Sequence, residues 1–114
     1  MSEDCTLADV AALLADETTQ AILTELSTEP MSANTLSRRC DASEPTVYRR
    51  LEELRRCDLL EEWTRPDPES GHHHTMYATN LNRVVVDLES DGFTYRVDRR
   101  ENMADRFTRL IEGI

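Results

Sequence analysis

Apolar side chains recur every three or four residues through the first half of the chain, a spacing that predicts amphipathic helices. Leu7, Val10 and Leu14 follow this spacing, and Thr6 ahead of them can cap a helix over residues 7–15. Asp16 can cap a second helix, which ends before the proline of Glu29-Pro30. The N-terminal region is therefore expected to be helical.

Two further helices are predicted between residues 32 and 57, separated by a short turn at Asp41-Ala42. Ser32 caps the first of them and Ser43 caps the second, because a serine side chain can accept a hydrogen bond from a free backbone N–H at the helix start. The second helix buries Val47, Leu51 and Leu54 on one face. A tight turn between two short helices matches helix-turn-helix spacing.

The second half of the chain favours strands. Residues 60–65 and 74–79 surround a turn-rich loop and predict one hairpin, and residues 83–98 predict another around Asp91-Gly92. The stretch Val84–Leu88 leaves a helical extension open as an alternative. A last amphipathic helix is expected over about residues 99–112.

These elements predict an α+β fold, mainly α: a winged helix-turn-helix with an extra C-terminal β-hairpin and a C-terminal dimerisation helix. Residues 1–80 would form the DNA-binding part and residues 81–114 the hairpin and dimerisation helix, within one compact domain. A chain of 114 residues is poorly placed to bury both terminal apolar stripes alone, so we expect a homodimer. Its predicted interface consists of Leu7, Val10, Leu14, Met103, Phe107, Leu110 and Ile111.

Charge changes the picture, because the net charge is −10 and all 13 basic residues are arginine. An acidic chain without lysine suggests adaptation to multimolar salt, where carboxylates hold water and cations and repulsion is screened within about 3 Å. Inorganic cations are therefore expected partners. The acidic start lacks an apolar segment typical of a signal peptide, and no apolar run approaches the roughly 20 residues of a membrane span, so a cytoplasmic location is expected.

The arginines are concentrated where DNA would bind: six of the 13 lie between Arg38 and Arg56, and none lies in the first 30 residues. On the outer face of the fourth helix, Arg49 can contact guanine and Thr46 can contact a base, while Tyr48 can reach a phosphate. The predicted contacts with double-stranded DNA are Arg38, Arg39, Ser43, Pro45, Thr46, Tyr48, Arg49, Arg50, Arg56, Arg65, His72 and His73.

The segment from Met31 to Leu60, with its Glu-Pro-Thr-Val-Tyr-Arg-Arg-Leu core, resembles the ArsR-like winged helix-turn-helix regulators of haloarchaeal type. The resemblance covers residues 7–80. It implies a dimer that pairs through its first and last helices and inserts one recognition helix into each of two successive major grooves. Metal-sensing members carry cysteine thiolates in the first helix of the motif, whereas this chain has Ser32–Ser37 without a thiol there, which argues against metal sensing by this route.

No arrangement of residues suggests catalysis or a cofactor, so we expect neither. The run His72-His73-His74 cannot bind one ion with all three rings, because neighbouring strand residues point to opposite faces. Cys40 and Cys57 end the two helices of the motif and are expected to pack as small apolar side chains, and Cys5 could cross-link a dimer.

Two alternatives remain open. A winged helix can serve as a protein-binding module that is indifferent to DNA. A redox-responsive regulator could sense through Cys40 and Cys57, since oxidation there would act directly on the DNA-reading unit.

Overall fold

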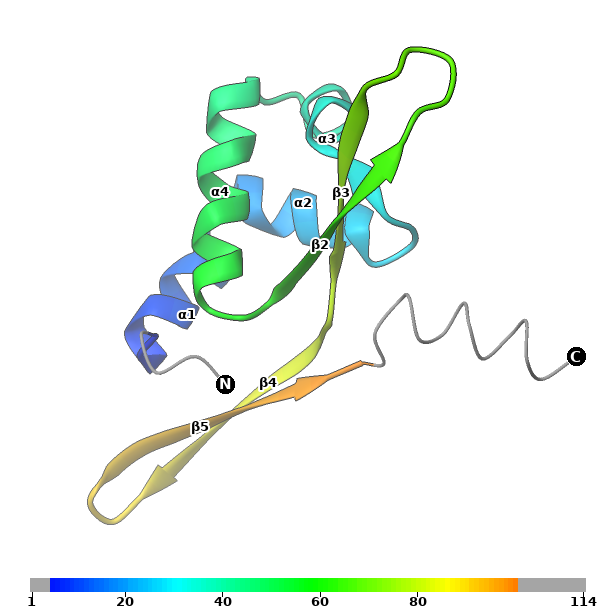
Figure 1. The fold of residues 1–114 in the computed structure, drawn as a ribbon. Coiled ribbons are helices and arrows are strands. Elements are labelled where there is room, and N and C mark those ends of the chain that lie inside the picture. Colours follow the sequence, from blue (N-terminus) through cyan, green and yellow to red (C-terminus); the bar gives the residue numbers. More distant parts are fainter. Residues whose placement is uncertain (1–4, 101–114) are drawn as a thin grey trace, which may run out of the picture.

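The computed structural model describes residues 5–100 of the chain. Helices α1 (Leu7–Ala15), α2 (Glu17–Leu26), α3 (Ala33–Arg39) and α4 (Glu44–Arg56) form a cluster at one side of the molecule (Figure 1). A three-stranded antiparallel sheet has the order β1-β3-β2, with β1 at Met31–Ser32, β2 at Leu60–Pro66 and β3 at His73–Thr79. Strands β4 (Leu81–Glu89) and β5 (Gly92–Arg99) form a separate two-stranded sheet. The α+β winged helix-turn-helix prediction is confirmed.

The helix starts follow the predicted caps. The Thr6 hydroxyl accepts from the Asp9 backbone N–H, and the Asp9 carboxylate accepts from the Thr6 N–H, which completes the capping box of α1. The Asp16 carboxylate caps α2 by accepting from the Thr19 N–H, and Ser32 caps α3 in the same way. Local hydrogen bonding therefore explains why sequence alone located these helices.

The core lies where α2, α3 and α4 meet β3. Ile22, Leu36 and Leu54 are fully buried there, and Leu59 is buried just before β2. Apolar burial of this kind supplies most of the stability of a small domain. The core thus holds the two helices of the motif in a fixed relation to the wing, the hairpin of β2 and β3.

The hairpin of β4 and β5 is a direct continuation of β3 and extends away from the helices, toward the opposite end from the wing (Figure 1). Its turn uses Gly92 at φ 133°, a conformation that side chains with a Cβ rarely adopt. Val84–Leu88 pairs residue by residue with β5, so this stretch is strand and the alternative of a helix is wrong.

The predicted C-terminal helix differs at its start, because Arg99 is the last residue of β5 and pairs with Leu81. Cross-strand pairing with β4 overrides the local helical pattern at this position. The remainder of that predicted helix, with Met103, Phe107, Leu110 and Ile111, lies outside the described residues.

Candidate nucleic-acid interface

The turn between α3 and α4 sets the angle of the motif. Asp41 adopts φ 50°, and the Ala42 N–H donates to the Ser37 carbonyl at 3.1 Å, which closes the end of α3. Ser43 then caps α4 by accepting from the Thr46 N–H at 3.3 Å. The sequence Asp-Ala-Ser thus ends one helix and starts the next within four residues.

Helix α4 separates its residues as the sequence pattern predicted. Val47, Leu51 and Leu54 are at most 2% exposed, so one face is fully committed to the core. Tyr48 is 53% exposed, although it carries a large apolar ring. The exposed outer side of the helix comprises Glu44, Pro45, Tyr48, Arg49, Glu52, Arg55 and Arg56.

The arginines on this outer side differ in whether they form ion pairs with neighbouring carboxylates. Arg55 is held by Glu52 at 2.7 Å and lies 3.6 Å from Glu62 of the wing. Its hydrogen bond with Glu52 raises the pKa of Arg55. Arg49 is exposed and has no hydrogen bond or ion pair with any other residue between 5 and 100. Arg56, the last residue of the helix, is likewise exposed and has no such partner among residues 5–100, so α4 keeps Arg49 and Arg56 available for an external anion or base.

Arg50 was predicted to grip the DNA backbone, but the structure places it differently. Its guanidinium binds the Asp16 carboxylate at 3.0 and 3.2 Å and also contacts Glu53 at 3.3 Å. The pKa of Asp16 is lowered, chiefly by the Thr19 backbone N–H, against a smaller opposite effect of burial. A helical wheel places Arg50 beside Leu54 on the edge of the buried stripe, and this signal could have assigned it to the domain interior.

The other residues of the motif that were predicted to contact DNA lie on its surface and differ in how strongly they are bonded to neighbouring side chains. Arg38 is exposed and bonds only weakly to Thr35 at 3.4 Å, whereas Arg39 lies 3.6 Å from Glu25. The Ser43 hydroxyl is engaged in capping and donates to the Thr46 hydroxyl at 2.9 Å. Capping therefore orients Ser43 and Thr46 without removing them from the exposed end of the helix.

The wing carries Arg65, His72 and His73 on its exposed tip, as predicted. Asp67 organises the loop between β2 and β3: its carboxylate accepts from the Ser70 hydroxyl at 2.9 Å and from the Glu69 N–H at 3.0 Å. These bonds, with that of Ser70 the largest cause, lower the pKa of Asp67. The structured loop therefore holds the three exposed cationic or titratable side chains on one projecting hairpin.

The histidine run lies at the start of β3 in the wing. His74 lies 3.4 Å from Asp67, a contact between two residues of the wing itself. Between residues 5 and 100, no three His, Cys, Asp or Glu side chains are grouped closely enough to hold a metal ion.

The predicted dimer residues of α1 are covered to different degrees within the single chain. Val10 is only 2% exposed and belongs to the core, while Leu7 and Leu14 are half-buried. Val10 is thus already packed before any partner binds.

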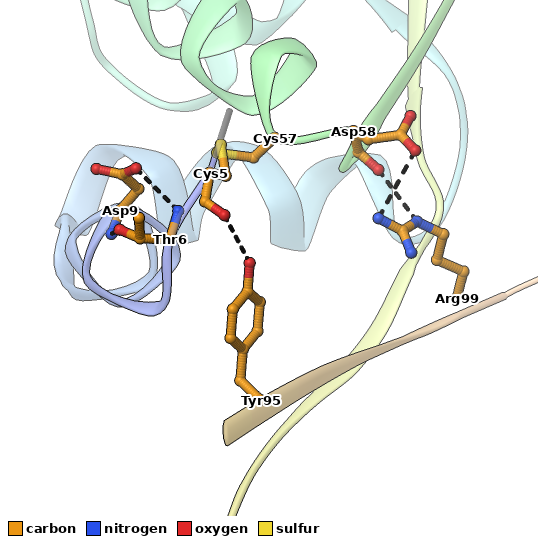
Figure 2. Close-up of a disulfide and its surroundings, with 7 residues drawn as sticks. All are labelled: Cys5, Thr6, Asp9, Cys57, Asp58, Tyr95 and Arg99. Atoms are coloured by element: carbon orange, nitrogen blue, oxygen red, sulfur yellow. Dashed lines mark hydrogen bonds and ion pairs between the residues drawn. A yellow bond between two sulfur atoms is a disulfide. The ribbon is translucent and has the colours of Figure 1, made fainter. Parts of the chain in front are cut away.

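A disulfide joins Cys5 to Cys57 across 52 residues, with their Cα atoms 5.4 Å apart (Figure 2). It ties the segment before α1 to the end of α4. Cys57 packs in the core as predicted, at 2% exposed, but as half of a disulfide, and the prediction that Cys5 could cross-link a dimer is wrong because Cys5 is bonded within its own chain. Three cysteines allow three pairings, and a contact over this separation has no local sequence signal.

Cys40 is the free thiol of the described chain and is half-buried at the end of α3. Burial raises the pKa of this thiol, and the nearby Glu25 carboxylate adds to the effect. The hypothesis of sensing through Cys40 and Cys57 is corrected accordingly, because the bonded partner of Cys57 is Cys5.

Comparison with known proteins finds relatives of the helix-turn-helix region and of the fold. Residues 14–62 match the family model described as a helix-turn-helix domain. The structure resembles NolR from Sinorhizobium fredii (TM-score 0.52, 24% identity, 63% of this chain and 66% of that one). It also resembles diamide-treated YodB from B. subtilis (TM-score 0.55, 19% identity, 68% and 75%). A third similar structure is a possible transcriptional regulator from Methanosarcina mazei Go1 (TM-score 0.51, 14% identity, 69% and 72%).

The match thus spans about two thirds of the NolR chain. A search of curated protein sequences found no significant match. The matched helix-turn-helix domain supports DNA binding by residues 14–62, and the solved structures share the fold. None of the helices between residues 5 and 100 is long and apolar enough to cross a membrane.

Proposed function

We propose that the chain is a sequence-specific transcription regulator that binds double-stranded DNA as a homodimer in the cytoplasm. Helix α4 enters the major groove and the wing contacts the backbone or the minor groove. The observation that carries this proposal is the exposed, unpaired Arg49 beside Thr46 and Tyr48 on the outer side of α4. A free guanidinium can donate to both O6 and N7 of guanine.

The fold supports a DNA-reading role for this side of the molecule. Helix α4 buries its apolar face completely, so its position is fixed by the core while its outer side stays accessible. Arg38 and Arg65 lie on the neighbouring elements α3 and β2 and are exposed to reach phosphates. Phosphate contacts position a protein on the duplex, while base contacts provide the sequence information.

The first test is selection of genomic DNA fragments by the purified protein, followed by sequencing and affinity measurement. Enrichment of a pseudo-palindrome with half-sites one helical turn apart is the expected result. Arg49→Ala should then weaken binding to the selected site by about 1–3 kcal/mol and relax one base position. Arg55→Ala is the matched control on the same helix, because Arg55 is already paired with Glu52. Equal affinities for the wild type and Arg49→Ala would contradict the proposed base contact.

High salt is part of the proposal, because the chain has a net charge of −10 and binds a polyanion. Release of counterions favours binding less as salt increases. For each phosphate contact, a tenfold increase in salt lowers the logarithm of the binding constant by about 0.9. We therefore propose that bound cations bridge acidic residues of α4, such as Glu52 and Glu53, to phosphates. Each of these carboxylates already pairs with an arginine, Arg55 and Arg50 respectively, but an ionised carboxylate has about four acceptor sites and can bind a cation as well. The acidic composition without lysine supports a regulator of the ArsR-like haloarchaeal type as part of this proposal. Affinity should hold or rise as KCl increases, and a steep loss would contradict this part while leaving DNA binding intact.

A second candidate function is redox control of DNA binding, and the Cys5–Cys57 disulfide favours it. Disulfides in cytosolic proteins are usually catalytic or redox-sensing, since the cytosol keeps thiols reduced. Reduction by a dithiol transfers two electrons and two protons to the disulfide, giving two thiols and an oxidised dithiol. The end of α4 would then lose its covalent tie to the segment before α1.

This candidate is tested by comparing DNA affinity before and after treatment with dithiothreitol. The wild type and Cys40→Ser should both change in affinity, whereas Cys5→Ser should bind identically under both conditions. An unchanged wild-type affinity, with reduction verified by mass spectrometry, would exclude redox control of binding.

A further inference from the structure

The β4–β5 hairpin has one apolar face that its own domain covers only in part. The cross-strand pairs Val84–Val97, Val86–Tyr95 and Leu88–Phe93 all lie on this face, since strand residues alternate in direction. Near the domain, Val84, Tyr95 and Val97 pack against the core. Toward the tip, Val86, Leu88 and Phe93 are 48%, 74% and 65% exposed.

The covered half of the hairpin is firmly attached, which makes the uncovered half a defined surface. The Tyr95 hydroxyl donates to the Cys5 carbonyl at 2.9 Å, and Arg99 Nε donates to the Asp58 carbonyl at 3.1 Å (Figure 2). An apolar stripe that continues from the core onto a projecting ribbon is typical of an interaction surface rather than of a loop in solvent.

The hairpin also has unpaired edges, because β4 and β5 pair only with each other among the described strands. A free edge presents backbone N–H and C=O groups that can pair with another strand. Both strands have residues of this face packed on the core, among them Val84 in β4 and Val97 in β5, so packing does not distinguish the two edges. The choice of the β4 edge rests on the charges along that strand.

The charges of β4 identify the partner as a second copy of the same strand. Arg83 stands near the domain, and Asp87 and Glu89 stand toward the tip. Antiparallel pairing of two β4 strands about Val86 places Arg83 of each copy opposite Glu89 of the other. The same register places Val84 opposite Leu88 and brings the two Val86 residues together, so the apolar positions match on one face, while on the other face Val85 lies opposite Asp87 between the two Arg83–Glu89 pairs.

Arg83 is exposed and shares its carboxylate partner with a second arginine, so it can take part in such a pair. Its guanidinium lies 3.0 Å from Asp98, which also binds Arg96, so two cations share one carboxylate. Arg83 is 66% exposed, and Glu89 has no ion pair within residues 5–100. Opposite charges facing each other across strands stabilise a sheet, while like charges destabilise it.

We propose that two copies of this chain pair through the edges of their β4 strands, forming a four-stranded antiparallel sheet centred on Val86. The proposal deepens the homodimer of the proposed function by naming a pairing surface besides the terminal helices. It commits to a second copy, and cover by residues 101–114 or by another protein is an outcome of the test.

The test measures mass in solution over a range of protein concentrations, in high salt, by light scattering or sedimentation. The double variant Leu88→Ser/Phe93→Ser should weaken dimerisation at least about tenfold, because it removes the exposed apolar contacts. Trp63→Ser is the matched control: Trp63 is another exposed large apolar residue, 37% exposed in β2. It should leave dimerisation unchanged.

Charge reversal tests the register independently of the apolar contacts. Arg83→Glu and Glu89→Arg should each weaken the dimer, and the double variant should restore it, because the pair reforms with opposite polarity. Circular dichroism shows whether each variant folds. If the apolar double variant does not fold, the charge-reversal variants still test the proposal.

Two results would overturn the proposal, and they are distinguishable. A wild type that dimerises while all hairpin variants dimerise equally would place the interface elsewhere, and the homodimer of the proposed function would stand. A monomeric wild type would exclude both the β4 pairing and the homodimer, whatever covers the hairpin face. DNA binding is measured separately by fragment selection, so its failure cannot be mistaken for either result.

Discussion

The helix-turn-helix region and the β4–β5 hairpin are both amphipathic, yet they cover their apolar faces to different extents. In α4, Val47, Leu51 and Leu54 are sealed beneath α2 and the wing, and only polar or functional side chains remain outside. In the hairpin, Leu88 and Phe93 stay exposed at the tip. The first arrangement fixes a surface for an external polar ligand, and the second leaves an apolar surface that a protein partner can cover.

The two regions also treat charge differently. In the motif, Asp16 and Arg50 join the α1–α2 junction to α4 in a half-buried ion pair. In the hairpin, Asp87 and Glu89 have no ion pair within the described part of the chain. The ion pair that joins helices of the domain therefore lies in a different region from the unpaired carboxylates of the hairpin, which can bind a partner.

Breaking the disulfide should have the largest effect on the helical side of this comparison. Cross-linking residues 52 apart lowers the entropy of the unfolded chain, and the chain-entropy model gives about 4 kcal/mol for such a loop. Cys5→Ser should lose most of this free energy of unfolding, measured by denaturant titration. Cys40→Ser is the control, and equal losses in the two variants would contradict a specific role of the disulfide.

Truncating one leucine in each region sharpens the difference. Leu54→Ala should lower the free energy of unfolding by about 3 kcal/mol, because Leu54 is 0% exposed and its removal leaves a cavity. Leu88→Ala should change it by less than about 0.5 kcal/mol at concentrations where the chain is monomeric. Similar losses from both variants under these conditions would mean that the tip of the hairpin is covered within the single chain.

Removing one carboxylate charge in each region tests how electrostatics differ. Asp16→Asn should cost about 1 kcal/mol at neutral pH, because it weakens the cap of α2 and the bond to Arg50. Asp87→Asn in the hairpin should have no measurable cost for the monomer. Denaturation monitored by circular dichroism measures both.

The same pair of variants has a predicted pH dependence. Folding lowers the pKa of Asp16, mainly through the Thr19 backbone N–H, with Arg50 adding to the effect. The stabilisation is therefore complete above the unfolded pKa of about 4 and is lost as pH falls through the lower folded pKa. The difference between wild type and Asp16→Asn should shrink in that acidic range. A difference that is constant from neutral pH to pH of about 2 would contradict the ionic contribution.

The smallest expected effect concerns Cys40, the half-buried thiol at the end of α3. Burial and the Glu25 carboxylate raise the pKa of Cys40, so less of it is thiolate at pH of about 8 than in a free thiol. Alkylation by iodoacetamide should be slower than for a cysteine peptide and should accelerate on unfolding in denaturant. A peptide-like rate in the native protein would show that the end of α3 is open.

The sequence by itself determined the local features of this protein. Helix starts were predictable because Thr6, Asp16, Ser32 and Ser43 cap through bonds over three residues. The outer side of α4, including Arg49, followed from the helical period, and the hairpin turns followed from residues such as Gly92. These features depend on neighbours within one turn of chain, where sequence order and spatial order agree.

Only the tertiary structure decided which distant residues meet. The pairing of Cys5 with Cys57, and that of Asp16 with Arg50 across 34 residues, arises from packing of α1 and α2 against α4. The strand state of Arg99 likewise depends on its partner Leu81 in β4. Such contacts depend on how whole elements pack, so they commit Arg50 to the domain and leave Arg49 free, although the two are adjacent arginines in one helix.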